Sequence, residues 1–218
     1  MHPLLPALQK GFDDLGLALP LEQQTQLLAY LDLIAKWTKV YNLTALRDAQ
    51  EMLTHHLLDS LAVIRPLRRE LATLVLPAER SVFELLDVGA GAGLPGIVVA
   101  ITCPDVRVTC VDTVAKKAAF IQQVAVTLKL PNLKGLHARV ESLTSPYDVV
   151  CSRAFASLVD FTSWSRLALA PHGVWMAMKG KHPEQELAAL PPNTHVFHVE
   201  QLQVPGLDAE RCIIWMRG

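Results

Sequence analysis

The sequence of 218 residues contains few cysteines and lacks the apolar runs of a membrane protein. The four cysteines, Cys103, Cys110, Cys151 and Cys212, form no CxxC pair, which argues against a disulfide scaffold or a zinc site and fits a reducing cytosol. No window of about 18 residues is both apolar and uncharged, so we expect no membrane span. Residues 1–10 have no apolar run behind a basic flank, which predicts no secretory signal.

Charge is balanced overall but unevenly distributed. The chain has 20 Lys and Arg against 21 Asp and Glu, and a net charge of −1 is by itself no sign of a nucleic-acid-binding protein. Segment 107–139, however, is basic with Asp112 as its single acid, whereas 184–210 has acids and no Lys or Arg. A locally basic face can meet a polyanion, although solvated helix faces explain the same pattern.

The first 75 residues are predicted to form helices. Apolar residues recur at helical spacing over 21–40. Asp48, with Glu51 three residues later, predicts the start of another helix, which we expect Pro66 to end. We therefore predict an N-terminal helical cap over residues 1–75.

From residue 76 onward, strands alternate with helices. Strands are predicted at 81–88, 107–112, 133–139, 147–151, 174–178, 195–204 and 212–217, and helices at 94–102, 114–129, 158–169 and 184–190. The sequence Pro171-His172-Gly173 is expected to stop the helix at 158–169. This alternation predicts an α/β domain over 76–218 with a parallel sheet covered on both faces, and the last two strands predict an antiparallel hairpin at one edge.

The most informative stretch is the glycine-rich segment 87–96, which follows the first predicted strand. Its last three glycines fit the GxGxxG pattern of NAD-binding proteins, with Asp112 about 20 residues on to hold a ribose. The register Asp87-x-Gly89-x-Gly91-x-Gly93 instead fits the loop of S-adenosylmethionine (SAM) methyltransferases, again with Asp112 at the ribose. A glycine-rich turn without any ligand is the third possibility.

Three features favour the methyl donor over a dinucleotide. The final hairpin suits the seven-stranded, Rossmann-like sheet of class I SAM-dependent methyltransferases. No second domain is large enough for a hydride-accepting substrate. Asp87 can accept the ammonium group of a methyl donor, whereas a pyrophosphate gains nothing from that carboxylate. An NAD-dependent oxidoreductase and a non-catalytic nucleotide-binding module remain as alternatives.

The residues after the fourth strand of such a domain usually face the methyl acceptor. Segment 151–156 lacks the Asn/Asp-Pro-Pro-Tyr/Phe motif of enzymes that methylate exocyclic amines, and Cys151 lacks the setting of a pyrimidine-attacking nucleophile. No general base is evident, which fits guanine N7, because this atom carries a lone pair and no proton. Proximity and alignment are then worth roughly 7–11 kcal/mol. Arg153 can contact a guanine edge, a phosphate or the donor, or form a salt bridge.

Six separated motifs together resemble one known family. They lie at 41–48 (YNLTALRD), 56–61 (HLLDSL), 87–96 (DVGAGAGLPG), 139–141 (RVE), 152–158 (SRAFASL) and 178–180 (MKG), and they cover most of the chain. In this combination the sequence resembles the bacterial RsmG, or glucose-inhibited division protein B (GidB), family of 16S rRNA guanine-N7 methyltransferases. Ala90 departs from the Thr or Ser that is common at its position, which removes no side chain that the chemistry needs.

The resemblance implies SAM as the donor and one guanine in the decoding-region loop of 16S rRNA as the acceptor. It implies that Gly89 and Leu94 line the methionine and adenosine side, that Val140 and Glu141 flank the adenine, and that Arg153 lies by the donor and the incoming base. It also implies an RNA approach past Asn42, Thr44 and His56.

Basic residues near the carboxyl ends of the strands are the predicted phosphate contacts: Lys116, Lys117, Arg139, Lys179 and Lys181. Because these basic residues are few, we expect the protein to bind naked RNA weakly. We therefore expect the substrate to be a small-subunit particle or an assembly intermediate. His55, His56 and Asp59 have helical spacing but no further ligand, so we expect no metal. A cytoplasmic monomer is expected.

Overall fold

The computed structural model describes residues 2–153, 155 and 157–218. Ala154 and Ala156 of the motif at 152–158 therefore lie outside the described residues. The N-terminal part is helical, as predicted. Its elements are α1 (Leu5–Leu15), α2 (Leu21–Tyr41), α3 (Ala49–Met52), the π-helical turn η1 (Leu53–Leu58), α4 (Asp59–Leu61) and α5 (Ile64–Leu71). Asp48 caps α3, since its carboxylate accepts hydrogen bonds from the backbone N–H groups of Gln50 and Glu51.

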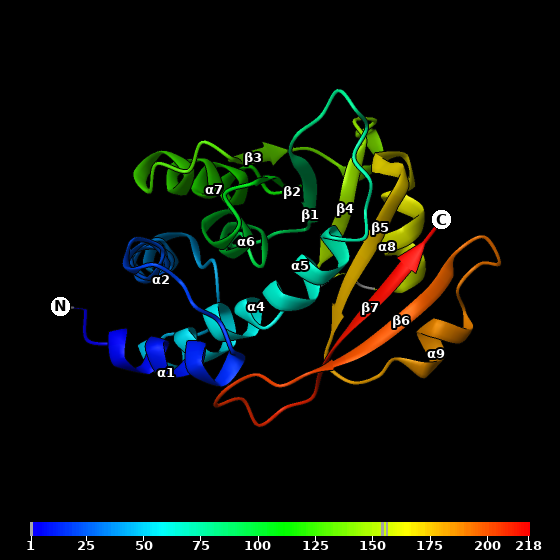
Figure 1. The fold of residues 1–218 in the computed structure, drawn as a ribbon. Helices are drawn as coiled ribbons and strands as arrows, with labels where there is room; N and C mark the ends of the chain where they lie inside the picture. Colours follow the sequence, from blue (N-terminus) through cyan, green and yellow to red (C-terminus); the bar gives the residue numbers. More distant parts are fainter. Residues whose placement is uncertain (1, 154, 156) are drawn as a thin grey trace.

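A seven-stranded sheet follows, in the order β3-β2-β1-β4-β5-β7-β6 (Figure 1). Its strands are β1 (Phe83–Val88), β2 (Val106–Asp112), β3 (Leu133–His137), β4 (Tyr147–Ser152), β5 (Leu169–Lys179), β6 (His195–Leu202) and β7 (Arg211–Arg217). The connecting helices are α6 (Gly96–Thr102), α7 (Ala115–Thr127), α8 (Leu158–Trp164) and α9 (Glu184–Ala188), with the 3₁₀ turns η2 (Val140–Ser142) and η3 (Arg166–Ala168). β7 runs antiparallel to both β5 and β6, so the predicted edge hairpin is confirmed.

Two predicted boundaries are wrong. Pro66 does not end a helix but is the third residue of α5. Proline is tolerated there because the N–H groups of the first turn of a helix have no hydrogen-bond partner within the helix. Pro171-His172-Gly173 lies inside β5, because α8 already ends at Trp164. The pairing of β4 with β5 shifts register there, from Tyr147 opposite Leu169 to Val149 opposite Val174, and such an irregularity accommodates proline in a strand.

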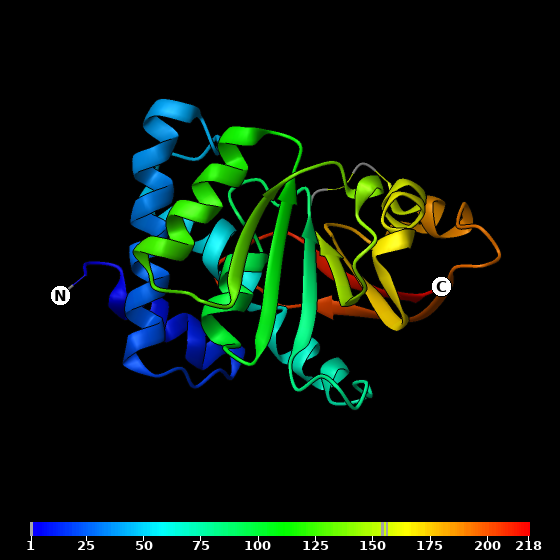
Figure 2. The ribbon, with the colours of Figure 1, turned by 90° about the horizontal axis from the view of Figure 1, so that it is seen from above.

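Both faces of the sheet are covered by apolar side chains. Leu85 of β1 belongs to a core that includes Phe120 of α7 and Leu27 of α2, whereas Leu86 faces a second core with Phe161 of α8. The helices α2, α6 and α7 lie together on the first face (Figure 2). The N-terminal helices thus share one core with the sheet, and the boundary between residues 75 and 76 stays a prediction.

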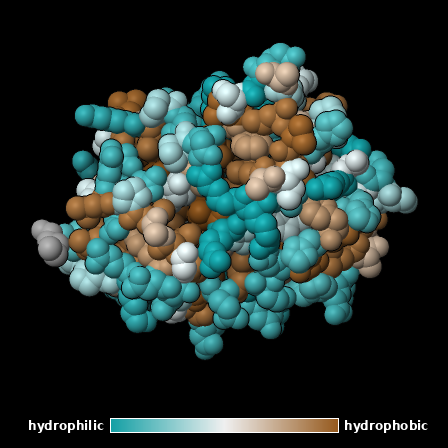
Figure 3. All heavy atoms as spheres, viewed as in Figure 1, coloured by the Kyte–Doolittle hydropathy of each residue, from teal (hydrophilic) through white to brown (hydrophobic). Residues whose placement is uncertain are grey.

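The N-terminal helices also hold the glycine-rich loop directly. The hydroxyl of Tyr30 on α2 donates a hydrogen bond of 2.7 Å to the carbonyl oxygen of Ala92, and the Tyr30 side chain is fully buried. Burial raises the pKa of this hydroxyl, so it remains a donor. On the face seen in Figure 3, hydrophilic side chains separate several hydrophobic areas. Among the described helices, none has the length and apolar character that a membrane span needs.

Candidate functional site

The glycine-rich loop joins β1 to α6 at the point where the strand order reverses between β1 and β4. In doubly wound sheets, ligands bind outside the carboxyl ends of the strands at this point. Gly91 has φ +61°, a conformation that side chains disfavour, and its N–H donates to Asp112 Oδ2 at 3.0 Å. Gly93 has φ +91°, and a Cβ there would clash with the Ile97 side chain. Both glycines are therefore needed for the shape of the loop.

Asp87 supports this loop from beneath. Its carboxylate is fully buried and accepts a hydrogen bond of 2.9 Å from the Gly96 N–H, while Oδ1 has no partner among the described residues. Burial raises the pKa of Asp87 to about 7. With no exposed surface, Asp87 is not accessible to the ammonium group of a methyl donor, so the expected direct contact is not part of the site in this structure.

Asp112 ends β2 and is fixed by the backbone of the two neighbouring loops. Oδ2 accepts from the Gly91 N–H, and Oδ1 accepts from the Val114 N–H at 2.8 Å. The ammonium group of Lys117 lies 3.8 Å from Oδ2. Since each carboxylate oxygen has two lone pairs, Asp112 can accept further hydrogen bonds from a ligand hydroxyl.

A cavity of about 550 Å³ opens beside Asp112, which we call the donor cavity. The predicted residues Gly89, Val140 and Glu141 line it, together with the predicted phosphate contacts Lys117 and Arg139. Its complete lining is Val88, Gly89, Val111, Asp112, Thr113, Val114, Lys117, Ala138, Arg139, Val140, Glu141, Phe155 and Trp164. The apolar walls, the bare backbone at Gly89 and the carboxylate acceptor suit a nucleoside.

Two aromatic residues also line the donor cavity: Phe155, which belongs to the motif at 152–158, and Trp164, which escaped sequence analysis. Phe155 and Trp164 meet edge to face with ring centroids 5.4 Å apart, and Trp164 is partly exposed. No motif marked Trp164, because it comes from the far end of α8. Leu94, by contrast, was expected in the site but is buried in the core behind the loop and lines neither the donor cavity nor the one described next.

A second cavity of about 350 Å³, the arginine cavity, lies by Arg153 at the end of β4. It is lined by His55, His56, Asp59, Arg153, Met178, Lys179, Gly180 and Arg211. Nη1 of Arg153 donates to the His55 carbonyl oxygen at 2.9 Å and to Asp59 Oδ2 at 3.2 Å. Arg153 thus forms the anticipated salt bridge and also lines a cavity.

His56 is held neutral in the wall of the arginine cavity. Its Nε2 lies 3.0 Å from the Thr44 hydroxyl oxygen, and the side chain is 6% exposed. Burial, followed by the nearby Arg153 charge, lowers the pKa of His56 to about 4. His56 is therefore a neutral hydrogen-bonding group at physiological pH and not a phosphate-binding cation.

The titration of His56 predicts a pH dependence of stability. Below pH 6.5 the unfolded chain takes up a proton on this histidine, whereas the native state does so only near pH 4, so stability falls as the pH falls through this interval. Relative to His56→Gln, the wild type should lose about 2 kcal/mol of unfolding free energy between pH 7 and pH 5. Urea unfolding at both pH values tests this, and a constant difference would contradict the buried, neutral histidine.

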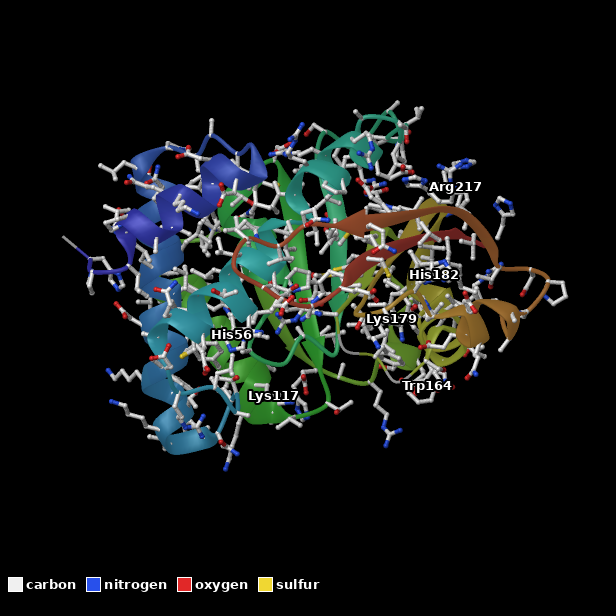
Figure 4. All side chains as sticks on the ribbon, turned by 90° about the horizontal axis from the view of Figure 1, so that it is seen from below. His56, Lys117, Trp164, Lys179, His182 and Arg217 are labelled. Carbon is white, nitrogen blue, oxygen red and sulfur yellow. The ribbon has the colours of Figure 1, made fainter. Side chains whose placement is uncertain are left out.

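The residues that are predicted to contact RNA differ in their exposure to solvent. Lys116 and Lys181 are exposed, and the Lys116 ammonium group lies 5.3 Å from the centre of the Tyr41 ring. Lys179 is largely buried and pairs with Glu186 at 2.8 Å. In Figure 4, His56 and Lys117 lie to the left and Lys179 lies to the right of them.

Asn42 follows α2 in a left-handed conformation, and its side-chain oxygen accepts from Arg47 Nη2 at 2.7 Å. It is exposed, as an RNA contact must be. Within the ranges that the structure describes, no group of three or more His, Cys, Asp and Glu side chains is arranged to hold a metal ion.

Comparison with solved structures supports the fold. TrmN from Thermus thermophilus matches with a TM-score of 0.55 and 18% identity over 72% of this chain and 48% of that one. The N-methyltransferase NodS from Bradyrhizobium japonicum, in complex with S-adenosylhomocysteine, matches with a TM-score of 0.54 and 14% identity over 84% of this chain and 98% of that one. The predicted class I methyltransferase fold is confirmed.

Comparison of sequences gives the family. The Polaromonas sp. protein named "Ribosomal RNA small subunit methyltransferase G" is 69% identical over 96% of this chain and 92% of its own length. The protein of that name from Albidiferax ferrireducens is 64% identical over 100% of this chain and 98% of its own. The model of the GidB family, described as rRNA small subunit methyltransferase G, matches residues 23–214. The resemblance seen in the motifs is confirmed, and the chain belongs to the GidB family of small-subunit rRNA methyltransferases.

Proposed function

We propose that this chain transfers a methyl group from SAM to N7 of a guanine in the decoding-region loop of 16S rRNA. The observation that carries this proposal is a pair of cavities, each lined by a residue of the short segment that follows β4. Phe155 lines the donor cavity, and Arg153, two residues earlier, lines the arginine cavity. A donor and an acceptor placed in these two cavities meet beside Arg153.

The donor cavity fits SAM by its chemistry. Gly89 offers bare backbone, Asp112 offers carboxylate oxygens for the ribose hydroxyls, and Val140 and Glu141 flank the space for the adenine. SAM supplies an activated methyl group when bound. The protein holds the two partners in line and excludes water, which is the contribution expected from proximity and orientation.

The arginine cavity fits an acceptor that needs no deprotonation. His56 is neutral but buried and engaged with Thr44, and Asp59 pairs with arginines, so neither is poised as a general base. Guanine N7 needs none, because it attacks through a free lone pair. Arg153 is the residue we assign to the acceptor base and the donor.

We further propose that a monomer acts in the cytoplasm on a small-subunit particle or assembly intermediate. The four cysteines are free thiols, which suits a reducing compartment. We assign Asn42 to the RNA approach and only five basic residues to phosphate contacts: Lys116, Lys117, Arg139, Lys179 and Lys181. Two of the lysines already have a carboxylate partner, Lys179 with Glu186 and Lys117 with Asp112. Such a surface gives modest affinity for RNA alone.

The test compares two substrates prepared from a strain that lacks the gene. Small subunits and protein-free 16S rRNA are incubated with the enzyme and radiolabelled SAM, and N7-methylguanosine is identified by mass spectrometry. We expect methylation of the particle at least about ten times faster than that of the bare RNA. Equal rates would contradict the proposal that the particle is the substrate. The absence of N7-methylguanosine from both substrates would contradict the proposed enzyme activity itself.

A further inference from the structure

Asp59 joins three distant parts of the chain at the arginine cavity. Its Oδ2 lies 3.2 Å from Nη1 of Arg153, at the end of β4, and its Oδ1 accepts from Nε of Arg211, at the start of β7, at 2.9 Å. The Asp59 side chain itself is 4% exposed, whereas those of Arg153 and Arg211 are 24% and 23% exposed. One buried carboxylate thus holds two guanidinium groups at the wall of a solvent-reachable cavity.

The two arginines keep donors for a ligand. The hydrogen bonds of Arg153 in the described structure all use Nη1, and those of Arg211 use Nε and Nη1, the latter to the Glu210 carbonyl oxygen at 2.8 Å. Because a guanidinium group has five N–H donors, Nη2 of each arginine and Nε of Arg153 remain for a further partner. The group of two arginines and one carboxylate has a net positive charge.

We propose, on the basis of the function above, that the arginine cavity receives the target guanine, that Arg211 is a specificity residue on its wall, and that Asp59 is the positioning residue that holds Arg153 and Arg211 in place. Asp59 reaches the reacting atoms only through the arginines. Arg211 has no motif around it, and its partner lies 152 residues earlier, so sequence analysis passed over it.

Guanine suits this wall better than adenine does. The edge of guanine that carries N7 presents two acceptors, N7 and O6, whereas the same edge of adenine presents an acceptor and an amino donor. A wall of arginine donors can bind O6 while N7 stays free for the methyl group. The adenine amino group would face those donors unpaired, which is costly in a desolvated site.

Asp59 is needed because two guanidinium groups repel each other. The carboxylate lies between them, and its removal leaves two partly buried like charges that separate. Asparagine in its place keeps volume and polarity but not charge. The arginines should then lose their positions while the donor cavity, which Asp59 does not line, keeps its shape.

The experiment compares Asp59→Asn, Arg211→Gln and their double variant with the wild type on small subunits. We expect each single variant to lose at least about tenfold in kcat at saturating SAM, with S-adenosylhomocysteine affinity within about twofold of the wild type. The double variant should be no worse than the poorer single variant, because Asp59 acts through the arginines. Asp59→Glu should restore part of kcat.

The matched control is Asp105→Asn, which removes a carboxylate bound by Arg68 at 2.5 and 2.7 Å before the start of β2, away from both cavities. It should methylate like the wild type. Full kcat in Asp59→Asn or Arg211→Gln would overturn the proposal, as would parallel losses of kcat, donor affinity and melting temperature in both. If Asp59→Asn does not fold, Arg211→Gln decides. A wild type that makes no N7-methylguanosine contradicts the proposed function instead.

Discussion

Replacement of Gly91 by valine is expected to remove measurable binding of S-adenosylhomocysteine. Gly91 has φ +61°, which a β-branched residue adopts only at a cost of order 1–3 kcal/mol. Its N–H also fixes Asp112, so a shifted loop displaces the carboxylate expected at the ribose. A Cβ at Gly91 meets only the Gly89 carbonyl oxygen, at 3.9 Å, and Gly91 itself does not line the donor cavity, so the expected loss comes from the shifted loop and Asp112 rather than from a clash within the protein.

Isothermal titration calorimetry measures this loss. Gly16→Val is the matched control, because Gly16 has φ +62° at the end of α1, outside the donor cavity, and carries the same backbone strain. Gly16→Val should bind S-adenosylhomocysteine as the wild type does. Affinity of Gly91→Val within about twofold of the wild type would show that the loop is not the donor site.

Arg153→Ala should fold normally and lose turnover by at least about a hundredfold. Folding is spared because Asp59 keeps its bond to Arg211, so the buried carboxylate is not left unpaired. We expect turnover to be lost because Arg153 directly follows β4, where we propose that the donor and the guanine meet. Arg153→Lys should recover little, since Nη1 alone makes the contacts with Asp59 and the His55 carbonyl oxygen, and a lysine has no counterpart of the Nη2 and Nε donors that remain for the ligand.

Initial rates on small subunits at saturating SAM, with melting temperatures measured in parallel, test this prediction. Arg68→Ala removes an arginine that also pairs with a carboxylate, Asp105, and should leave the rate unchanged. Normal turnover of Arg153→Ala would mean that Arg153 has only a structural role, in which it connects the segment after β4 to the N-terminal helices by hydrogen bonds.

The local sequence pattern predicted most of the helices and strands of this chain correctly. The glycine loop, Asp112 at the end of β2 and the final hairpin all follow from residues close together in the sequence. Pro66 was misread because proline is compatible with the first turn of a helix as well as with its end. Pro171 was misread because the register shift between β4 and β5 depends on a partner strand.

The parts of the site that could not be predicted from the sequence depend on packing between distant segments. Arg211 lines a cavity because β7 inserts next to β5 and brings its first residue to Asp59. Asp87 ends beneath the loop because α6 starts directly above it, with Gly96 donating to its carboxylate. No pattern within one segment reports such contacts, so the sequence singled out Asp87 and Arg153 but not the neighbours that determine what each of them does.

The most direct measurement of the central claim is a crystal structure with S-adenosylhomocysteine. We expect the purine beside Val140, Glu141 and Phe155, the ribose hydroxyls on Asp112, and the sulfur directed toward Arg153 with the arginine cavity still open. A ligand bound elsewhere, or a donor cavity that side chains close while the ligand stays unbound at saturating concentration, would contradict the account.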